Sequence, residues 1–251
     1  MYNDRVRSAA RDALAAGSSV SDVARSLGVA RSTIREWRDR PNSPSRQIDK
    51  QCPRCSPHRS WSLCSYAALL GFYLGDGCLS THVGKVVLRV SWDESHPGIV
   101  DDVSELIATL APHRTVFHVP APGTTVVQAG WKHWLCLFPQ HGPGRKHERT
   151  IALEPWQQEI VDAHPADFLR GLFHSDGCRT RNWATKVVAG EKKRYDYPRW
   201  EFSNRSDDIH ALCGAALDKL QIPWRRSGRF HLSVSRREAV AALDAAIGPK
   251  A

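Results

Sequence analysis

The chain has 251 residues, of which 41% are hydrophobic and 24% charged, and its formal net charge is +9. This composition is typical of a globular protein with a packed core, and it excludes intrinsic disorder. No apolar run approaches the roughly 18 residues of a membrane span, and residues 1–16 lack the apolar core of a signal peptide. We therefore expect a cytoplasmic protein.

The charge is distributed unevenly along the chain. Residues 1–50 carry +4, residues 51–178 carry −2 and residues 179–251 carry +7. Two basic regions that flank an acidic middle favour a polyanionic partner such as DNA.

Three short helices are predicted before residue 40. Helices over 6–16 and 20–27 each end at a glycine, and a third over 30–38 would bury Ile34 and Trp37. The segment 20–37 resembles the helix-turn-helix of recombinases and transposases, whose recognition helix enters the major groove. The alternative is a three-helix bundle with a solvated basic face. The third helix would present to DNA the side chains of Arg31, Ser32, Thr33, Arg35 and Arg38.

Residues 46–64 are predicted to link this domain, residues 1–45, to the core, residues 65–251. Cys52 and Cys55 form a C-x₂-C pair, the usual half of a structural zinc site, and His58 and Cys64 could complete four ligands. The alternative is a loop of free, partly buried thiols. Seven cysteines, an odd number, fit a reducing compartment.

A ten-residue motif occurs twice, at Leu69–Cys78 and at Leu169–Cys178, and five of its positions are identical. A repeat of this kind indicates one structural unit used twice. Each copy is apolar, carries small residues four positions apart and ends in Asp-Gly-Cys. Small residues on one helix face let two helices approach closely. Asp76 and Asp176 would then emerge side by side, where two carboxylates repel each other unless a cation lies between them.

This arrangement predicts a divalent-metal site at the two acids. A single hydrophobic helix that ends in Asp-Gly is more often purely structural, because both residues suit helix termini and turns. Two copies with the same small-residue face favour the functional interpretation.

After each motif the sequence predicts two strands, a helix, two strands and a helix. In the first half, residues 65–165, these include a strand over 85–92, a helix over 96–110, strands over 116–119 and 124–138, and a helix over 154–163. In the second half, residues 166–251, they include a strand over 197–203, a helix over 207–220, a strand over 230–235 and a helix over 236–247. We therefore predict an α+β fold with a duplicated αββαββα unit and pseudo-two-fold symmetry, preceded by a small all-α domain.

Residues 65–251 resemble the LAGLIDADG homing endonucleases in their single-chain, two-motif form, on the strength of the duplicated motif. The resemblance implies a saddle whose sheets lie along DNA. It also implies that Asp76 and Asp176 bind a catalytic Mg²⁺ or Mn²⁺ ion, assisted by the backbone carbonyls of Gly75 and Ser175. The motifs depart from the consensus: its alanine is Leu70 and Arg170 here, and its earlier acid is Leu74 and His174. These departures make the helix interface atypical but leave the metal-binding acids in place.

The loop over 139–149 holds two glycines and crowds basic and imidazole side chains together. The resembled family has a basic residue near the metal, at the end of the fourth strand, which implies Lys146 as a catalytic cation. For the second half no lysine is obvious at the matching place, and the candidates are Arg229, Arg236 and Arg237.

A saddle on DNA needs basic and polar side chains that alternate along its strands. The alternative for any single lysine is a solvated surface position. The candidates are Lys85, Arg89, Gln128, Lys132, Arg181, Lys186, Lys192, Lys193, Arg194, Arg199 and Arg229.

The function these features favour is that of a site-specific double-strand DNA endonuclease, monomeric because both motifs are in one chain, and associated with the nucleoid. The alternative is a DNA-binding transcriptional regulator on the same scaffold without cleavage activity, similar to some bacterial sporulation regulators. The retained aspartates favour the enzyme, whereas the added helix-turn-helix and the altered motif helices favour the regulator.

Overall fold

A computed structural model of the chain describes residues 4–39, 52–56, 60–82, 85–93 and 96–250. The chain divides into two compact units, Met1–Arg59 and Ser60–Ala251. Among the described residues, no helix is long and apolar enough to cross a membrane.

The first unit contains α1 (Asp4–Ala15), α2 (Val20–Leu27) and α3 (Arg31–Asp39), as the apolar spacing predicts. Ser19 caps α2, since its Oγ accepts a hydrogen bond from Asp22 N at 3.2 Å. Gly28 ends α2 with a φ of +62°, the left-handed conformation that glycine adopts without strain. The three helices enclose a small core that consists of Ala10, Val23, Ala24, Val29, Ile34 and Trp37.

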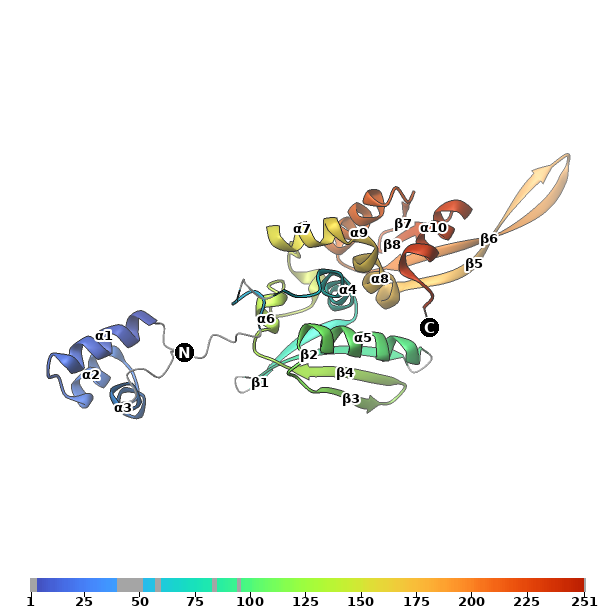
Figure 1. Cartoon of the computed structure of the whole chain (residues 1–251). Coiled ribbons are helices and arrows are strands. Elements are labelled where there is room, and N and C mark those ends of the chain that lie inside the picture. The colour runs from blue at the N-terminus through green and yellow to red at the C-terminus, as the bar shows by residue number, and fades with distance from the viewer. Residues whose placement is uncertain (1–3, 40–51, 57–59, 83–84, 94–95, 251) are drawn as a thin grey trace. The chain divides into compact units, whose positions relative to one another are not determined.

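The second unit has two similar halves joined by a short connection (Figure 1). The first half comprises α4 (Leu63–Leu74), β1 (Gly77–His82), β2 (Lys85–Asp93), α5 (Pro97–Leu110), β3 (Val116–Ala121), β4 (Thr124–Gly130) and α6 (Trp134–Leu137). The connection holds the 3₁₀ turn η1 (Lys146–Glu148) and α7 (Pro155–Ala163). The second half comprises α8 (Pro165–Asp176), β5 (Gly177–Val188), β6 (Glu191–Ser203), α9 (Asp207–Lys219), β7 (Arg225–Gly228), β8 (His231–Val234) and α10 (Arg237–Ile247).

Each half forms one antiparallel four-stranded sheet, with the strand orders β1-β2-β4-β3 and β5-β6-β8-β7. The matching orders confirm the predicted α+β fold with a duplicated αββαββα unit.

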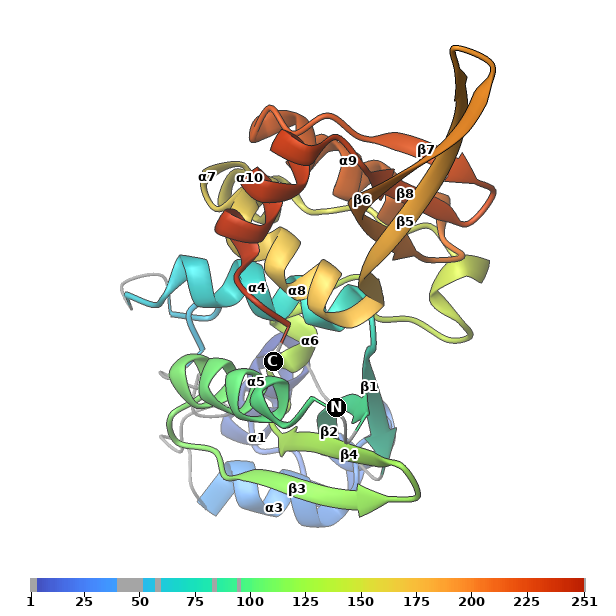
Figure 2. The same ribbon diagram turned by 90° about the vertical axis from the view of Figure 1, so that its right-hand side faces the viewer.

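The motif helices α4 and α8 lie side by side between the two sheets (Figure 2). Neither Gly71 nor Gly171 has room for a side chain, because a Cβ at Gly171 would lie 2.7 Å from Phe72 N and one at Gly71 would lie 2.9 Å from Gly171 Cα. This contact confirms that the small residues of the two motifs let the helices touch backbone to backbone.

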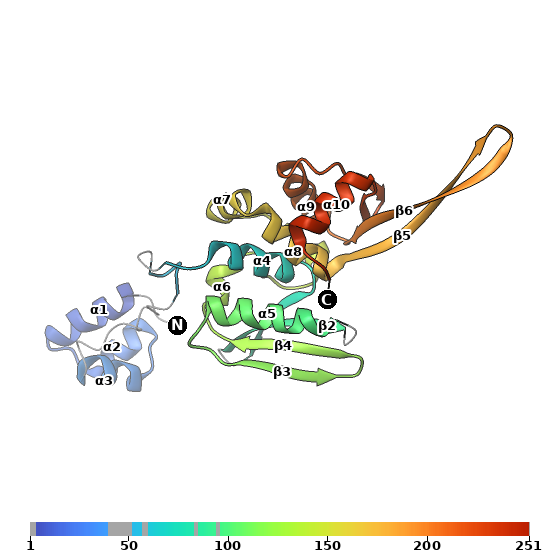
Figure 3. The same cartoon turned by 45° about the vertical axis from the view of Figure 1, so that its right-hand side comes forward.

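Each sheet has one face covered by helices. In β2 the even-numbered residues from Val86 to Trp92 are buried, while the odd-numbered ones are exposed or half-buried, and α5 packs over this sheet (Figure 3). In the second sheet the covered face carries Trp200, Phe202, Leu232 and Val234. The opposite, open faces carry mainly exposed or half-buried side chains among the described residues.

Two predicted strands differ from the structure. The strand predicted over 124–138 ends at Gly130, and α6 follows it. The buried residues of this segment are Trp131, Trp134, Leu137 and Phe138. Their spacing of three and four residues puts them on one side of a helical turn, whereas a strand would point some of them to its opposite face.

The strand predicted over 197–203 is longer in the structure than in the prediction. It is the end of β6, which pairs with β5 as far out as Val188 opposite Glu191. Only Trp200–Ser203 of β6 also pair with β8. The outer part of the β5–β6 hairpin therefore projects from its sheet (Figure 1).

Candidate active site

The two motif acids stand where the packed helices end. Gly75 follows α4 and faces the last turn of α8: a Cβ at Gly75 would lie 2.6 Å from Ser175 Oγ and 3.5 Å from Asp176 Oδ2. Only glycine fits there. Because glycine has no side chain, the carboxylate of Asp176 can lie against the end of the first motif. The predicted meeting of the two motif ends is confirmed by this contact.

Burial raises the pKa of both motif acids. Partial burial raises the pKa of Asp176 to about 6, and the negative charge of Asp76 adds to that rise. Loss of hydration also raises the pKa of Asp76, although its outer side is exposed. A cation shared by two such carboxylates would relieve their repulsion.

Lys146 belongs to η1, and its ammonium lies at the end of α4, close to the motif acids as the resemblance implies. Its Nζ donates hydrogen bonds to Tyr73 O at 2.7 Å and Leu74 O at 2.8 Å, and it also donates to Gly75 O. Burial lowers the pKa of Lys146 to about 8, against the attraction of Asp176 and Asp76. The ammonium thus neutralises the negative end of the α4 dipole beside both acids.

The loop over 139–149 is fixed by its own polar contacts. Arg149 Nη1 donates to Gly144 O at 2.7 Å, and Arg145 N donates to Glu148 Oε2 at 3.2 Å. At its base the buried side chain of Gln140 donates to Ala152 O at 2.9 Å. The position of Lys146 is therefore set by a folded loop.

Lys250 occupies the corresponding place at the end of α8. Its Nζ donates to Gly177 O at 2.8 Å and lies 3.4 Å from Ser175 O. Lys146 and Lys250 are the two cations that lower the pKa values of both motif acids. The expectation that Arg229, Arg236 or Arg237 supplies the second cation is therefore corrected to Lys250.

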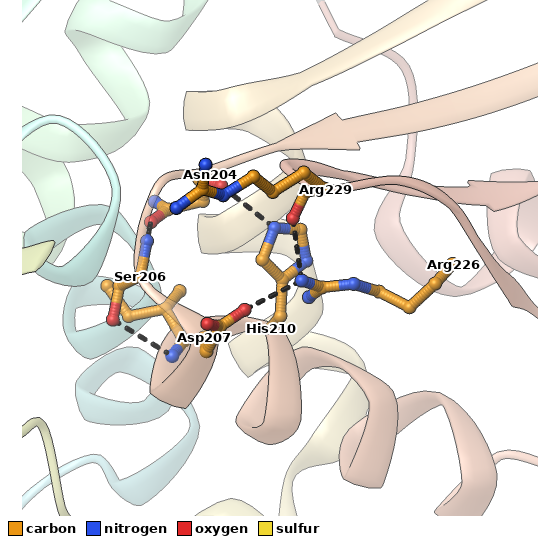
Figure 4. Close-up of polar contacts among 7 residues, drawn as sticks. Asn204, Ser206, Asp207, His210, Arg226 and Arg229 are labelled. Atoms are coloured by element: carbon orange, nitrogen blue, oxygen red, sulfur yellow. Dashed lines mark hydrogen bonds and ion pairs between the residues drawn. The ribbon is translucent and has the colours of Figure 1, made fainter.

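Asn204 is a site residue that the sequence did not indicate. Its Nδ2 donates to Asp176 Oδ2 at 2.6 Å. Figure 4 shows how it is held: Asn204 Oδ1 accepts from Ser206 N at 2.8 Å, and His210 Nε2 lies 2.9 Å from Asn204 O. Arg226 ties the neighbouring elements together, because its Nη2 donates to Asp207 Oδ1 and to Arg229 O, both at 2.7 Å.

Part of this site lines an open cleft of about 310 Å³, although Asp76 and Lys250 are not among its lining residues. It contains the carboxylate of Asp176, the amide of Asn204 and the ammonium of Lys146, so it presents both anionic and cationic groups. Its remaining lining residues are Leu74, Gly75, Arg145, His147, Ser203 and Arg205.

Solved structures similar to the core include endonucleases. I-DmoI in complex with DNA and Mn is similar with a TM-score of 0.50 and 12% identity, over 75% of this chain and 99% of that chain. The LAGLIDADG meganuclease I-AabMI bound to uncleaved DNA gives a TM-score of 0.46 and 12% identity, over 72% of this chain and 82% of that chain. Residues 60–251 have the LAGLIDADG fold.

Other comparisons concern both units of the chain. The N-terminal LAGLIDADG domain of DUF199/WhiA gives a TM-score of 0.46 and 15% identity, over 82% of this chain and 91% of that chain. Residues 4–50 match the helix-turn-helix family model described as Transposase. A search of curated protein sequences gave no match.

Arg170 and His174, which depart from the LAGLIDADG consensus, both contact other residues of the second unit. Arg170 forms an ion pair with Asp102 of α5. His174 is buried against the Phe72 ring, 3.4 Å from Gly248 O, and burial lowers its pKa to about 4. Both side chains therefore serve the packing of the LAGLIDADG helices.

The zinc ligands predicted from the C-x₂-C pair stay a prediction. Cys52 is buried and Cys55 is exposed, in a turn where Cys55 N and Ser56 N both donate to Cys52 O, at 3.2 and 2.9 Å. Cys64 lies in the first turn of α4, where its Sγ is 3.2 Å from Ser62 Oγ. His58 lies outside the described residues.

The predicted recognition helix presents the expected face. In α3, Ile34 and Trp37 are buried, Thr33 is half-buried, and the remaining candidates, Arg31, Ser32, Arg35 and Arg38, are exposed. Arg38 pairs with Asp39 at 2.8 Å, an exposed pair that DNA phosphates can displace.

The predicted DNA-binding residues of the core fall in two places. On the open face of the first sheet, Arg89 pairs in register with Gln128, Lys85 lies at the start of the same strand, and Lys132 is exposed just beyond β4. The β5–β6 hairpin carries Arg181, Lys186, Lys192, Lys193, Arg194 and Arg199.

Two of the hairpin arginines already have acidic partners. Arg194 pairs with Asp196 at 2.9 Å and covers the Trp183 ring, and Arg199 pairs with Glu201. Arg229 is exposed over the Phe230 ring and does not belong to the hairpin.

Proposed function

We propose that this protein is a metal-dependent endonuclease that cuts both strands of a specific DNA site. The observation that carries the proposal is the pair of carboxylates, Asp76 and Asp176, at the ends of two packed LAGLIDADG helices with a lysine ammonium at each helix end. A helix interface alone needs neither the acids nor the two half-buried cations, which cost desolvation free energy.

The donors of the site fit a hard divalent cation. Asp76 and Asp176 would hold Mg²⁺ or Mn²⁺, with the carbonyls of Gly75 and Ser175 as further ligands, and carboxylate and carbonyl oxygens suit these ions. A carbonyl oxygen has two lone pairs, so the lysine contacts leave room for a second partner. I-DmoI, which shares the fold, was solved with Mn. Such an ion supplies Lewis-acid stabilisation and a more nucleophilic water.

The reaction we propose is hydrolysis of a phosphodiester. The oxygen of a water molecule bonds to phosphorus, the bond between phosphorus and O3′ breaks, and O3′ takes up a proton while the water loses one. Lys146 would stabilise the negative charge that grows on the phosphate oxygens. Asn204 would keep the carboxylate of Asp176 oriented by its 2.6 Å hydrogen bond.

The DNA interface would combine three surfaces of the chain. The open face of the first sheet and the projecting hairpin would contact phosphates and base edges, and α3 would add contacts in a major groove. In the hairpin Lys186 lies directly opposite Lys193. Like charges at such a cross-strand pair are destabilising, and a polyanion would relieve the repulsion.

The alternative function is a DNA-binding regulator that does not cleave. Its supporting observation is that both motif helix ends already have ammonium partners, at Tyr73–Gly75 and at Ser175 and Gly177. Because lysine ammonium groups neutralise the negative ends of both motif helices, the scaffold is stable without a metal.

One experiment separates the two functions. Purified protein is incubated with a randomised duplex library, with Mg²⁺ or with EDTA, and both bound DNA and cut ends are sequenced. We expect cut ends that share one sequence and require Mg²⁺. Enrichment of one bound sequence with no cut ends in Mg²⁺ or Mn²⁺ would establish the regulator instead.

We also propose that Cys52 and Cys55 belong to a structural zinc site, as their C-x₂-C spacing predicts. Metal analysis of the purified protein should find about one zinc per chain, the stoichiometry of a four-ligand site. Cys52→Ser should remove it, whereas the control Cys213→Ser, at a buried cysteine of α9, should retain it. Zinc retained in Cys52→Ser would contradict the site.

A further inference from the structure

The outer hairpin, residues 180–199, extends beyond the sheet that carries it. Residues 191–199 of β6 pair with β5 but not with β8, whose pairing begins at Trp200. At 3.3 Å per residue, this two-stranded part is about 30 Å long, and one turn of B-DNA is about 34 Å. Its tip stands clear of the other elements of the second unit (Figure 2).

The tip of the outer hairpin consists of four residues without a polar side chain, Val187, Val188, Ala189 and Gly190. Val187 is 67% exposed, more than any other large hydrophobic residue among those described, and Val188 is 39% exposed. The two valines are neighbours on β5, so they point to opposite faces of the hairpin. The tip is therefore apolar on both faces, which suits end-on insertion better than contact with a flat surface.

The turn at the tip is narrow. Ala189 and Gly190 have φ values of +54° and +85° and connect Val188 to its partner Glu191. A two-residue turn with positive φ at both positions ordinarily contains Asn, Asp or Gly. Alanine adopts this conformation at a cost, so turn chemistry does not explain Ala189. Its small apolar side chain keeps the tip thin and free of polar groups.

Positive charge surrounds the apolar tip. Lys186 precedes Val187, Lys192 lies opposite Val187, and Lys193 follows, all three exposed. Glu191 is the one acidic residue between positions 185 and 194. An apolar end ringed by ammonium groups matches DNA, in which charged phosphates flank an apolar stack of bases. An apolar surface on a partner protein would leave the three lysines without a role.

We propose that this tip is a wedge that enters the minor groove beside the recognised site, separates two stacked base pairs and bends the duplex; this inference rests on the DNA binding of the proposed function but not on cleavage. Proteins that bend DNA in this way insert apolar side chains between base steps, and the extra contacts that bent DNA makes offset the cost of unstacking. Here the lysines around the tip would supply those contacts, to phosphates on either side of the kink.

The wedge would act on one side of the recognised site only. The equivalent hairpin of the first half, β1–β2, has six paired positions and ends at His82 opposite Lys85, whereas β5–β6 has twelve. The pseudo-two-fold symmetry of the fold is therefore broken at the hairpins, and the DNA next to the second half alone should be distorted.

The test uses a duplex that contains the selected site with an additional helical turn on each side, without added divalent metal so that neither strand is cut. The fluorescent base 2-aminopurine, whose emission rises when it is unstacked, replaces one flanking base at a time. A donor and an acceptor dye label the two ends of the duplex. We expect wild type to raise the emission in one flank only, and energy transfer between the ends should indicate a kink of about 20–90°.

The double variant Val187→Ser, Val188→Ser should lose both signals, because serine removes the apolar surface of the wedge. Both valines are exposed, so the fold should be unaffected. The double variant Val187→Leu, Val188→Leu should keep both signals. Leu135→Ser is the matched control, since it removes a leucine of α6 that is 42% exposed and lies outside the hairpin, and it should behave as wild type does.

A variant of the lysines separates charge from insertion. Each lysine that meets a phosphate contributes about 0.9 to the slope of log K against log salt, so Lys192→Ala, Lys193→Ala should lower the slope by about 1.8. At saturating protein the rise in 2-aminopurine emission should remain.

Two results would overturn the inference. One is unchanged emission at every flanking position when wild type is bound, and the other is a rise that Val187→Ser, Val188→Ser leaves intact. Cleavage of the selected duplex without unstacking would keep the proposed function and reject the wedge. Unstacking without cleavage in Mg²⁺ or Mn²⁺ would reject the endonuclease and keep the wedge.

Discussion

Lys146 is the residue whose substitution best separates catalysis from binding. Its ammonium contacts three carbonyls at the end of α4 and is attracted by both motif acids. We expect Lys146→Ala to lower the cleavage rate by about 10²–10³ and DNA affinity far less, because its charge acts on the phosphate mainly during the reaction. Single-turnover rates and equilibrium binding to the same duplex measure the two quantities.

The arginine variant at this position adds a second comparison. Lys146→Arg should restore the rate only partly, since a planar guanidinium cannot take the place of a compact ammonium among three carbonyls. An equal fall in rate and affinity in Lys146→Ala would show that the residue anchors a phosphate and is not catalytic.

Among the elements, the contact between α4 and α8 sets the geometry of the site. A Cβ at Gly171 would lie 2.7 Å from Phe72 N and 2.8 Å from Gly71 Cα, and backbone atoms cannot give way as a side chain can. We expect Gly171→Ala to lower the free energy of unfolding by about 1–3 kcal/mol, the typical cost of overpacking. Urea denaturation measures it.

Gly130→Ala is the control for this substitution. Gly130 ends β4, and nothing lies within 4 Å of the position its Cβ would take. Its stability should stay close to that of wild type. A Gly171→Ala protein as stable as Gly130→Ala would mean that the two motif helices are not packed as closely as described.

Helices that bury an apolar face could be predicted from the sequence. The motif helices, α5, α9 and α10 have apolar residues at helical spacing, and the repeated small residues predicted their contact. The outer part of the β5–β6 hairpin could not be predicted. Its exposed, charged sequence lacks the alternation of apolar and polar side chains that indicates a strand. Its conformation depends instead on the pairing of β6 with β5 along Gly177–Val188.

The candidate site was predictable where it lies within the repeated motif. Asp76 and Asp176 are marked by the repeat, and Lys146 by its basic loop. Asn204 and Lys250 carry no local pattern, because the fold brings them to the acids from the end of β6 and from beyond α10.

At the scale of the whole molecule, the helix-turn-helix unit should add to DNA recognition without being needed for the core to fold. Residues 60–251 form a compact unit with its own buried interior. We expect deletion of residues 1–45 to weaken binding to the selected site while leaving the melting transition of the core in place. Every base pair that α3 no longer reads would cost about 1–3 kcal/mol of discrimination.

Fluorescence anisotropy with the selected and a scrambled duplex measures this change. The quadruple variant Arg31→Ala, Ser32→Ala, Arg35→Ala and Arg38→Ala should reproduce the deletion, since these exposed side chains form the face of α3. Unchanged affinity and specificity in both proteins would show that α3 does not read the site.

The central claim is that Asp76 and Asp176 together form one metal-dependent hydrolytic site. It is tested most directly by cleavage of the selected duplex in Mg²⁺ by wild type, Asp76→Asn and Asp176→Asn, with DNA binding measured in parallel. Each substitution removes a metal ligand and relieves the repulsion between two crowded carboxylates. The account predicts that both variants bind the duplex at least as tightly as wild type and cut neither strand. Cleavage at the wild-type rate by either variant would contradict it.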